Sequence, residues 1–240
     1  MIKLNLGSGI ALQAGFINVD YMFTLEELKK GAGKKGDFFE QGSVPRGAKF
    51  VQANITKLPF PDEYADLVEA HQILEHLRFK EIIPALQEIL RVTKKGGVIR
   101  FSTPNFDNLC LQWVNMLGKP QHLMDWKSWM DQAECFYGYQ ANEGETHRNP
   151  ITPYSLNNYL NIAGYAGCIA KVTIFPINAL VPTKGFGLIG ATMRKYVQTH
   201  KKEKGHRVFR CETIYAEIEK GKGAGRDTGK RSPNKKQKVV

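Results

Sequence analysis

Cysteine is scarce in this chain of 240 residues, which holds four of them, at positions 110, 135, 168 and 211. No two are separated by only two residues, so the chain contains no CxxC pair. Disulfide frameworks hold many cysteines in a short chain, and cysteine zinc sites usually contain closely spaced pairs. The spacing therefore excludes both classes of protein and predicts four reduced thiols.

Long apolar runs are also lacking. The longest stretch near the C-terminal end, residues 172–183, is interrupted by Pro176 and Pro182, whereas a membrane-spanning helix needs roughly 20 apolar residues. No apolar run follows Lys3 in the manner of a secretory signal. With a hydrophobic content of 42%, the chain has enough apolar residues for one core. We expect a cytoplasmic protein that makes no membrane contact.

Acidic residues are few at the C-terminal end, and this makes the net charge uneven. Residues 201–240 contain 13 Lys and Arg against 5 Asp and Glu, a net +8 of the total +11, so the first 200 residues carry only +3. The basic character belongs to this segment, which weakens the case for a nucleic-acid-binding domain. We expect a domain over residues 1–198 and a basic, largely disordered tail over residues 199–240.

Strand-like and helical patterns alternate along the domain. The pattern predicts strands over residues 3–6, 16–20, 49–53, 65–70 and 98–101. It predicts a short helix capped by Thr24 and a longer helix over residues 78–92, with Lys94, Lys95, Gly96 and Gly97 at its end. Such alternation favours a parallel sheet with crossover helices.

The second half of the domain is less regular. Residues 119–150 are rich in aromatic residues and show no period, so we interpret them as an insertion that covers a substrate. Thr152 and Pro153 predict the start of a helix that is closed by Gly164. Two final strands are expected over residues 170–175 and 187–194.

Three short segments suggest a cofactor site. Gly7, Ser8 and Gly9 follow the first strand, where glycine permits a tight turn and a close approach of the backbone to a ligand. Asp20 ends the second strand, where a carboxylate is able to accept the hydroxyls of a ribose. Asn54 and Ile55 follow the third strand and offer a polar group and an apolar wall for an adenine ring. The dinucleotide pattern GxGxxG is not met, because Leu12 occupies its third glycine position.

Six motifs in order carry a resemblance to a known family. The chain resembles the type 11 branch of class I S-adenosylmethionine-dependent methyltransferases over roughly residues 2–110. The motifs that carry the resemblance are LNLGSG at residues 4–9, GFINVD at 15–20, LPFPD at 58–62, HQILEHL at 71–77, LRVTKKGG at 90–97 and STPN at 102–105.

The resemblance implies an α/β fold with a doubly wound, mostly parallel seven-stranded sheet and an antiparallel edge strand. It implies S-adenosylmethionine as the cofactor. The matching positions assign Gly7, Ser8 and Gly9 to its methionine part, Asp20 to its ribose, and Asn54 and Ile55 to its adenine. They place His71 near the methionine end. Two features depart from the family: Asp20 follows Gly9 after only eleven positions, too few for a full helix, and Asn54 stands where aspartate is common.

The residues that would act on an acceptor are less clearly indicated. Methyl transfer depends mostly on positioning, although a hydroxyl acceptor also calls for a base. We expect His147 and His71 to be the catalytic residues, and we keep three further candidates in view: Glu75, His76 and Glu145. An alternative interpretation is that Glu75 and His76 only orient the turn after the fourth strand, and that His147 is an ordinary loop residue.

A metal site is considered and not expected. Glu75 and His76 together with a distant histidine are similar to the Glu-x-x-Glu-His metal site of small-RNA 2′-O-methyltransferases. Gln72 stands in place of the first glutamate, and a neutral amide is a poor magnesium ligand beside a carboxylate.

Three functions remain open from the sequence. The first is a methyltransferase for a small-molecule or sugar-type acceptor, with a pocket lined by aromatic residues. The second is an RNA or other nucleic-acid methyltransferase that uses the basic tail. The third is a non-catalytic cofactor-binding module. The aromatic residues concerned, which serve equally well as core, are Trp113, Trp126, Trp129, Phe136, Tyr137 and Tyr139.

Overall fold

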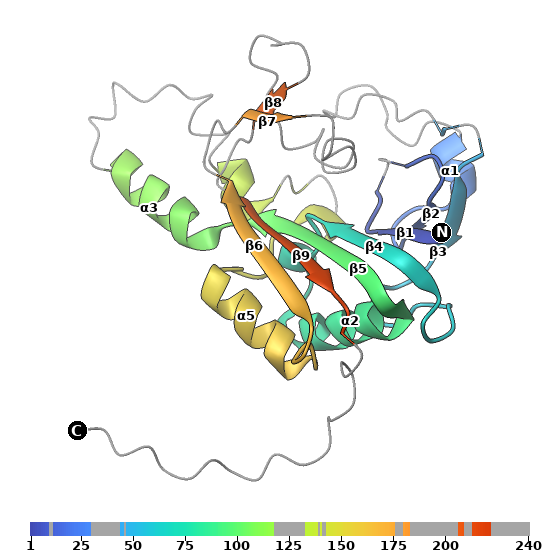
Figure 1. Ribbon diagram of the computed structural model, residues 1–240. Helices are drawn as coiled ribbons and strands as arrows, with labels where there is room; N and C mark the ends of the chain where they lie inside the picture. The colour runs from blue at the N-terminus through green and yellow to red at the C-terminus, as the bar shows by residue number, and fades with distance from the viewer. Residues whose placement is uncertain are drawn as a thin grey trace.

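The computed structural model contains a seven-stranded sheet in the order β3-β2-β1-β4-β5-β9-β6 (Figure 1). The first five strands in this order are parallel, whereas β9 is antiparallel to both of its neighbours. The strands are β1 (Lys3–Leu6), β2 (Ile17–Asp20), β3 (Lys49–Gln52), β4 (Ala65–His71), β5 (Thr93–Pro104), β6 (Ile169–Phe175) and β9 (Thr213–Glu219). A separate pair is formed by β7 (Leu180–Pro182) and β8 (His206–Val208).

The structure describes most of the domain. The described residues are 1–9, 12–29, 44–45, 47–117, 133–138, 140, 143–175, 180–182, 206–208 and 213–221. The expected strand over residues 187–194, most of the insertion, and Trp126, Trp129 and Tyr139 lie outside these residues. The helices are α1 (Leu25–Lys29), η1 (Leu74–His76), α2 (Phe79–Val92), α3 (Phe106–Leu117), η3 (Glu143–Glu145) and α5 (Pro153–Ile162).

The two faces of the sheet differ sharply. Side chains alternate along each strand, so Leu4, Val68 and Ile99 lie on one face with Leu86 of α2 and Leu160 of α5, in a single core. Figure 1 shows α2 and α5 together on this side of the sheet. The opposite face carries a polar row, because the register pairs Asn5 with Glu69, Glu69 with Arg100, and Arg100 with Glu217.

The fold class expected from the sequence is confirmed, including the reversal of strand order between β1 and β4 that a doubly wound sheet requires. The antiparallel strand β9 lies between β5 and the edge strand β6. Two helix starts are also confirmed. The Thr152 hydroxyl accepts the Ser155 N–H at 3.0 Å before α5, and the Thr24 hydroxyl accepts the Glu27 N–H at 3.2 Å before α1.

Four residues expected to end the longer helix do not do so. Helix α2 ends at Val92, and Thr93–Gly97 already belong to β5. The Thr93 backbone is extended, and its hydroxyl bonds the Ile89 carbonyl at 2.6 Å. The cation at this helix end is Lys220, whose ammonium donates to the Leu90 and Thr93 carbonyls at 2.8 and 2.7 Å. Positive charge is stabilising at a helix C-terminus, but here the charge belongs to Lys220, which directly follows β9.

The boundary of the basic tail also needs correction. Strand β9 lies within residues 199–240, so the assignment of residues 213–219 to a disordered tail is wrong. Ile214, Ala216 and Ile218 alternate with more polar residues and are buried in the core. The strongly basic segments on either side hid this short period-2 pattern in the composition. Helix α3, which the sequence analysis missed, adds a second correction.

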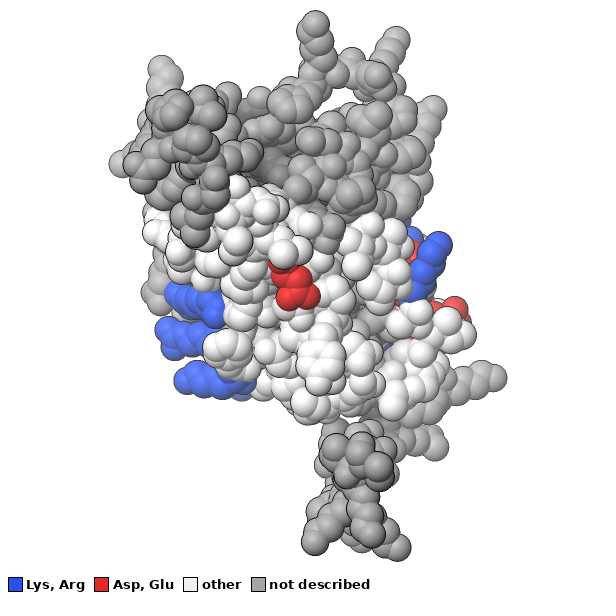
Figure 2. Space-filling model, turned by 90° about the vertical axis from the view of Figure 1, so that its left-hand side faces the viewer, with Lys and Arg blue, Asp and Glu red and all other residues white. Residues whose placement is uncertain are grey.

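The edge strand β6 leaves part of the apolar surface uncovered. Val172 and Ile174 of this strand are 51% and 44% exposed. Figure 2 shows one face of the molecule, on which basic side chains lie at the margins, acidic side chains lie at the centre and at one margin, and the surface between them is uncharged. Within the described residues, no helix combines the length and the apolar character needed to cross a membrane.

Candidate active site

The candidate site lies where the strand order reverses. Strands β1 and β4 are adjacent. The strand that follows β1 lies toward one edge of the sheet, and the strand that follows β4 lies toward the other edge. In open α/β sheets, ligands bind outside the carboxyl ends of the strands at this point. The loops after β1, β2, β4 and β5 meet there, and they contain most of the residues singled out in the sequence.

The loop after β1 needs its glycines for two different reasons. Gly7 and Gly9 have φ angles of +63° and +50°, a region that side chains disfavour. A Cβ atom on Gly7 would also lie 2.4 Å from Cδ1 of Ile73, whereas a Cβ on Gly9 would meet nothing within 4 Å. The loop is fixed to β2 because the Ser8 N–H donates to the Val19 carbonyl at 3.1 Å. Among the described residues, the space beside Gly9 is open, which is the property that a cofactor loop requires.

Asp20 is joined directly to this loop. One of its carboxylate oxygens accepts the Gly9 N–H at 2.7 Å, and the other accepts the Met22 N–H at 2.8 Å. Asp20 is 9% exposed. A carboxylate oxygen has two lone pairs, so an oxygen that holds one backbone N–H is able to accept a ribose hydroxyl as well. The loop and the carboxylate therefore fit the methionine and ribose parts of S-adenosylmethionine.

The short connection between β1 and β2 is held by Asn18 in place of a helix. The side-chain oxygen of Asn18 accepts the backbone N–H of Gln13 at 2.8 Å and the side-chain amide of Asn5 at 2.9 Å. Its own amide donates to the Gln13 and Lys49 carbonyls at 3.1 and 3.0 Å. This hydrogen bonding accounts for the missing helix noted in the sequence.

Asn54 and Ile55 lie beyond β3 in different environments. The Asn54 side chain is exposed, and its oxygen accepts the Thr56 N–H and hydroxyl at 2.9 and 2.8 Å, which closes a turn. Ile55 is only 7% exposed and packs in the main core. Contact of either residue with adenine stays a prediction.

His71 ends β4 and is buried on the polar face of the sheet. Its Nδ1 lies 2.9 Å from the Ser102 hydroxyl, and its Nε2 lies 3.7 Å from a carboxylate oxygen of Glu69. The ring stacks on Tyr215 with a centroid distance of 6.3 Å. Burial raises the pKa of Tyr215 to about 12. Only 1% of His71 is exposed, so its position indicates support of the loop rather than contact with a bulky acceptor.

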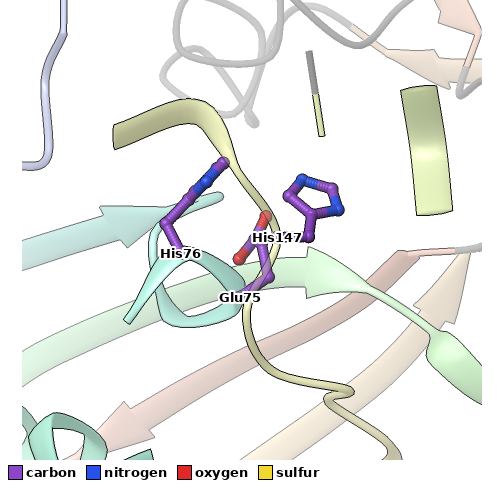
Figure 3. A group of neighbouring side chains, drawn as sticks. All are labelled: Glu75, His76 and His147. Carbon is purple, nitrogen blue, oxygen red and sulfur yellow. The ribbon is translucent and has the colours of Figure 1, made fainter. Parts of the chain in front are cut away.

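Three candidates from distant parts of the sequence come together at η1. Glu75, His76 and His147 each offer one ligand atom, and these atoms lie within 4.8 Å of one another. Figure 3 shows the three side chains facing a common space. We refer to Glu75, His76 and His147 as the donor cluster. The rings of His76 and His147 are 4.8 Å apart and nearly perpendicular.

The backbone around the donor cluster is fixed by several contacts. The Glu75 carbonyl accepts the Arg148 and Asn149 N–H groups at 2.7 and 3.0 Å. The Asn149 side-chain amide donates to the Leu77 carbonyl. Residues 146–149 are therefore attached to the turn after β4, about 70 positions earlier in the chain.

Gly138 has a structural role that sequence reasoning missed. The His147 N–H donates to the Tyr137 carbonyl at 3.0 Å, and Gly138 forms a β-bridge with Thr146. Gly138 has a φ angle of +79°, and a Cβ there would lie 2.0 Å from the Glu145 carbonyl oxygen. Only glycine allows this approach. The one available signal was a glycine within an aromatic segment, which is not specific.

The aromatic residues of the described part form a compact group. Phe136 contacts Phe106, Trp113 and Tyr137 at centroid distances of 5.0, 5.6 and 4.9 Å. Leu109 and Cys135 are buried beside them. This group packs α3 against residues 133–137, which are helical, and it supports the segment that carries Gly138. Three of the four cysteines are described, and all three are free thiols.

Comparison with known proteins gives consistent results. Residues 7–101 match a family model described as a methyltransferase domain. The chain is similar to a ubiquinone/menaquinone biosynthesis C-methyltransferase from Psychromonas ingrahamii, with 39% identity over 150 residues, covering 59% of this chain and 53% of that protein. A protein of the same name from Vibrio vulnificus strain YJ016 is 37% identical over 76 residues, covering 30% and 28%.

The chain thus spans about half or less of the length of these relatives. Among solved structures, an S-adenosylmethionine-dependent methyltransferase from Thermotoga maritima aligns with a TM-score of 0.51 and 12% identity, covering 91% of this chain and 81% of that chain. This likeness supports the fold. The family match agrees with the resemblance drawn from the motifs, which implies S-adenosylmethionine as the cofactor.

Proposed function

We propose that this chain, which matches a methyltransferase domain over residues 7–101, transfers a methyl group from S-adenosylmethionine to a small-molecule acceptor. The observation that carries the proposal is the hydrogen bond between the Gly9 N–H and the Asp20 carboxylate. It joins the glycine loop and the acid into one unit at the point where the strand order reverses.

The cofactor supplies a methyl group on a sulfonium, which is already an activated electrophile. The chain's own task is therefore to orient the two reactants. We assign the loop of Gly7, Ser8 and Gly9 to the methionine part, Asp20 to the ribose hydroxyls, and Asn54 with Ile55 to the adenine. His71, held by Ser102 and close to Glu69, acts as a positioning residue beneath the methionine end.

On the acceptor side, we assign the proton-accepting role to His147. It lies beside His76 and Glu75 at the end of the turn that follows β4. That turn also contacts the cofactor loop, because Ile73 fills the space at Gly7. A base in this position would remove the proton of a hydroxyl acceptor as the methyl group arrives.

A nucleic-acid acceptor is a second candidate, supported by one observation. Residues 222–240 hold 7 Lys and Arg against a single Asp, a net +6. Such a segment adds salt-dependent affinity for phosphates. Because β9 belongs to the sheet, this idea is tested by removal of residues 222–240 rather than of the whole segment from residue 201. Equal turnover by the full and shortened chains on an RNA acceptor would count against the idea.

The proposal is tested by calorimetry with S-adenosylmethionine and its demethylated product. The substitution Asp20→Ala should weaken binding by about 1–3 kcal/mol, because the ribose hydroxyls and the Gly9 N–H lose a charged partner. The matched control is Asp107→Ala, since Asp107 is exposed on α3. If the folded wild-type chain gives no heat with either ligand, the proposal fails. If the chain binds the cofactor but methylates no compound in an acceptor screen, the result would favour the third function, a non-catalytic cofactor-binding module.

A further inference from the structure

We propose that Glu75, His76 and His147 bind a divalent transition-metal ion of the zinc type, with one coordination position left open toward the acceptor. The three ligand atoms lie within 4.8 Å of one another, and Figure 3 shows them facing the same space. The proposed role of this ion in catalysis rests on the proposed function, whereas the binding itself does not.

The chemistry of the donor set selects the ion. Two imidazoles and one carboxylate are a set that binds Zn²⁺ in enzymes that keep an open position. Mg²⁺ prefers oxygen ligands, and the absence of a second glutamate at Gln72 counts only against that ion. Gln72 is occupied elsewhere, since its amide donates to the Ser102 hydroxyl at 3.3 Å. A transition metal therefore replaces the expectation of no metal.

Neighbouring groups orient two of the three donors for coordination. Nδ1 of His76 lies 3.2 Å from the Thr146 carbonyl, and a carbonyl only accepts, so Nδ1 carries the proton. In the neutral ring this leaves Nε2 with the lone pair that a metal requires. The Thr103 hydroxyl donates to Oε2 of Glu75 at 3.1 Å. Such partners are typical of metal-binding histidines and carboxylates.

The backbone brings the third donor to the other two. Hydrogen bonds from Arg148 and Asn149 to the Glu75 carbonyl, at 2.7 and 3.0 Å, fix the segment that carries His147. Zinc–nitrogen bonds of about 2.0–2.1 Å require donor atoms roughly 3.4 Å apart in a tetrahedron. The ligand atoms of the donor cluster lie within 4.8 Å of one another, so small rotations of the three side chains would bring them to this spacing.

The position of the donor cluster indicates the class of acceptor. It follows Ile73, the residue that contacts the loop at Gly7, so an ion here would lie near the loop that we assign to the methionine part of the cofactor. When the ion is bound, His147 is its ligand and no longer the proton acceptor, and the ion takes over that task because a metal of this kind lowers the pKa of an oxygen that it binds. The inferred acceptor is thus a hydroxyl compound: its O–H bond and the S–CH₃ bond of the cofactor break, the O–CH₃ bond forms, and the proton passes to solvent.

The test is a titration of the full chain, stripped by a chelator, with Zn²⁺ in a calorimeter and with Co²⁺ in an optical spectrometer. We expect one ion per chain, and visible Co²⁺ bands typical of nitrogen and oxygen ligands. His147→Gln, His76→Gln and Glu75→Gln should each lower the affinity by at least about 10–100-fold. The matched control, Glu219→Gln, changes an exposed glutamate at the end of β9 and should leave the affinity unchanged.

Three results would overturn the proposal: no binding by the folded wild-type chain, equal binding by wild type and all three variants, or a Co²⁺ spectrum of thiolate ligation. Thermal unfolding of each variant establishes that it is folded. Binding of S-adenosylmethionine is measured on the same samples. Cofactor binding without metal binding would reject only this inference, and metal binding without cofactor binding would reject only the proposed function.

Discussion

The two halves of the proposed site, one assigned to the cofactor and one to the acceptor, are built in different ways. The cofactor half consists of turns that directly follow strands, such as Gly7–Gly9 after β1 and Asp20 at the end of β2. The acceptor half joins the turn at Glu75 to residues 146–149, which are far away in the sequence. The cofactor half is formed by residues close together in the sequence, so it is visible as a sequence motif, whereas the acceptor half depends on tertiary contacts. A site made in this way allows the acceptor to change while the cofactor loop stays the same.

The largest expected effect separates the two halves by function. We expect His147→Ala to reduce turnover by roughly 10²–10⁴-fold, the usual loss when a catalytic base or its equivalent is removed. Cofactor affinity should stay within about twofold, since His147 contacts Tyr137 and His76, which lie outside the loop of Gly7, Ser8 and Gly9. Steady-state kinetics and calorimetry on the same sample measure both quantities. An equal loss of cofactor affinity would mean that the two halves are not separate.

The next effect tests how the acceptor half is held together. Gly138→Ala places a Cβ 2.0 Å from the Glu145 carbonyl oxygen at a φ angle of +79°, and we expect it to lower the free energy of unfolding by about 2–4 kcal/mol. Gly47→Ala is the matched control, because Gly47 has a φ angle of +76° and open space around it. Urea unfolding of both variants gives the comparison. If the free energy of unfolding falls by the same amount in both variants, the close contact at Gly138 contributes nothing beyond the strain of its φ angle.

The same contrast explains what the sequence predicted well. Local signals were reliable: Thr152 and Pro153 start α5, and the alternation of Leu4, Asn5 and Leu6 marks a strand. The association of Glu75, His76 and His147 into one cluster was not predictable, because it depends on hydrogen bonds between segments about 70 residues apart. No property of either segment alone carries that information.

Two errors have a common physical origin. Lys94 and Lys95 looked like the cations at the end of α2, yet they pair with Asp66 and Glu63 at 2.8 and 3.2 Å. Lys220 occupies the helix end instead, since β9 returns into the sheet beside β5. The composition of residues 199–240 concealed that strand, and with it the residue that stabilises the helix end.

A smaller effect concerns pH and the loop of residues 58–62. Glu88 accepts the Leu58 N–H at 2.7 Å, and Arg91 donates to the Leu58 and Phe60 carbonyls at 3.1 and 2.8 Å. Hydrogen bonding to Arg91 holds the pKa of Glu88 below its ordinary value.

A carboxylate whose pKa is lowered in the folded state adds stability above its unfolded pKa. That stability is lost as the pH falls through the folded pKa. We expect Glu88→Gln to cost about 1–3 kcal/mol at neutral pH and to flatten the decline of stability in acid. Urea unfolding from neutral to acidic pH measures this, with Glu26→Gln on the exposed side of α1 as control. Parallel acid profiles for wild type and Glu88→Gln would contradict the assignment.

The smallest expected effect concerns the end of the chain. Removal of residues 222–240 should change the free energy of unfolding by less than about 0.5 kcal/mol, as is usual for changes away from packed or hydrogen-bonded groups, and should leave cofactor affinity unchanged. The cut preserves Lys220, whose N–H donates to the Gly97 carbonyl at 2.9 Å and whose ammonium holds the end of α2. A cut before Thr213 would instead delete β9 from its place between β5 and β6, and we expect that chain not to fold. Thermal unfolding of the chain that ends at Gly221 and of the chain cut before Thr213 tests both expectations. A fall of many degrees for the chain ending at Gly221 would show that the basic residues beyond it belong to the folded domain, and that the boundary drawn after β9 is misplaced.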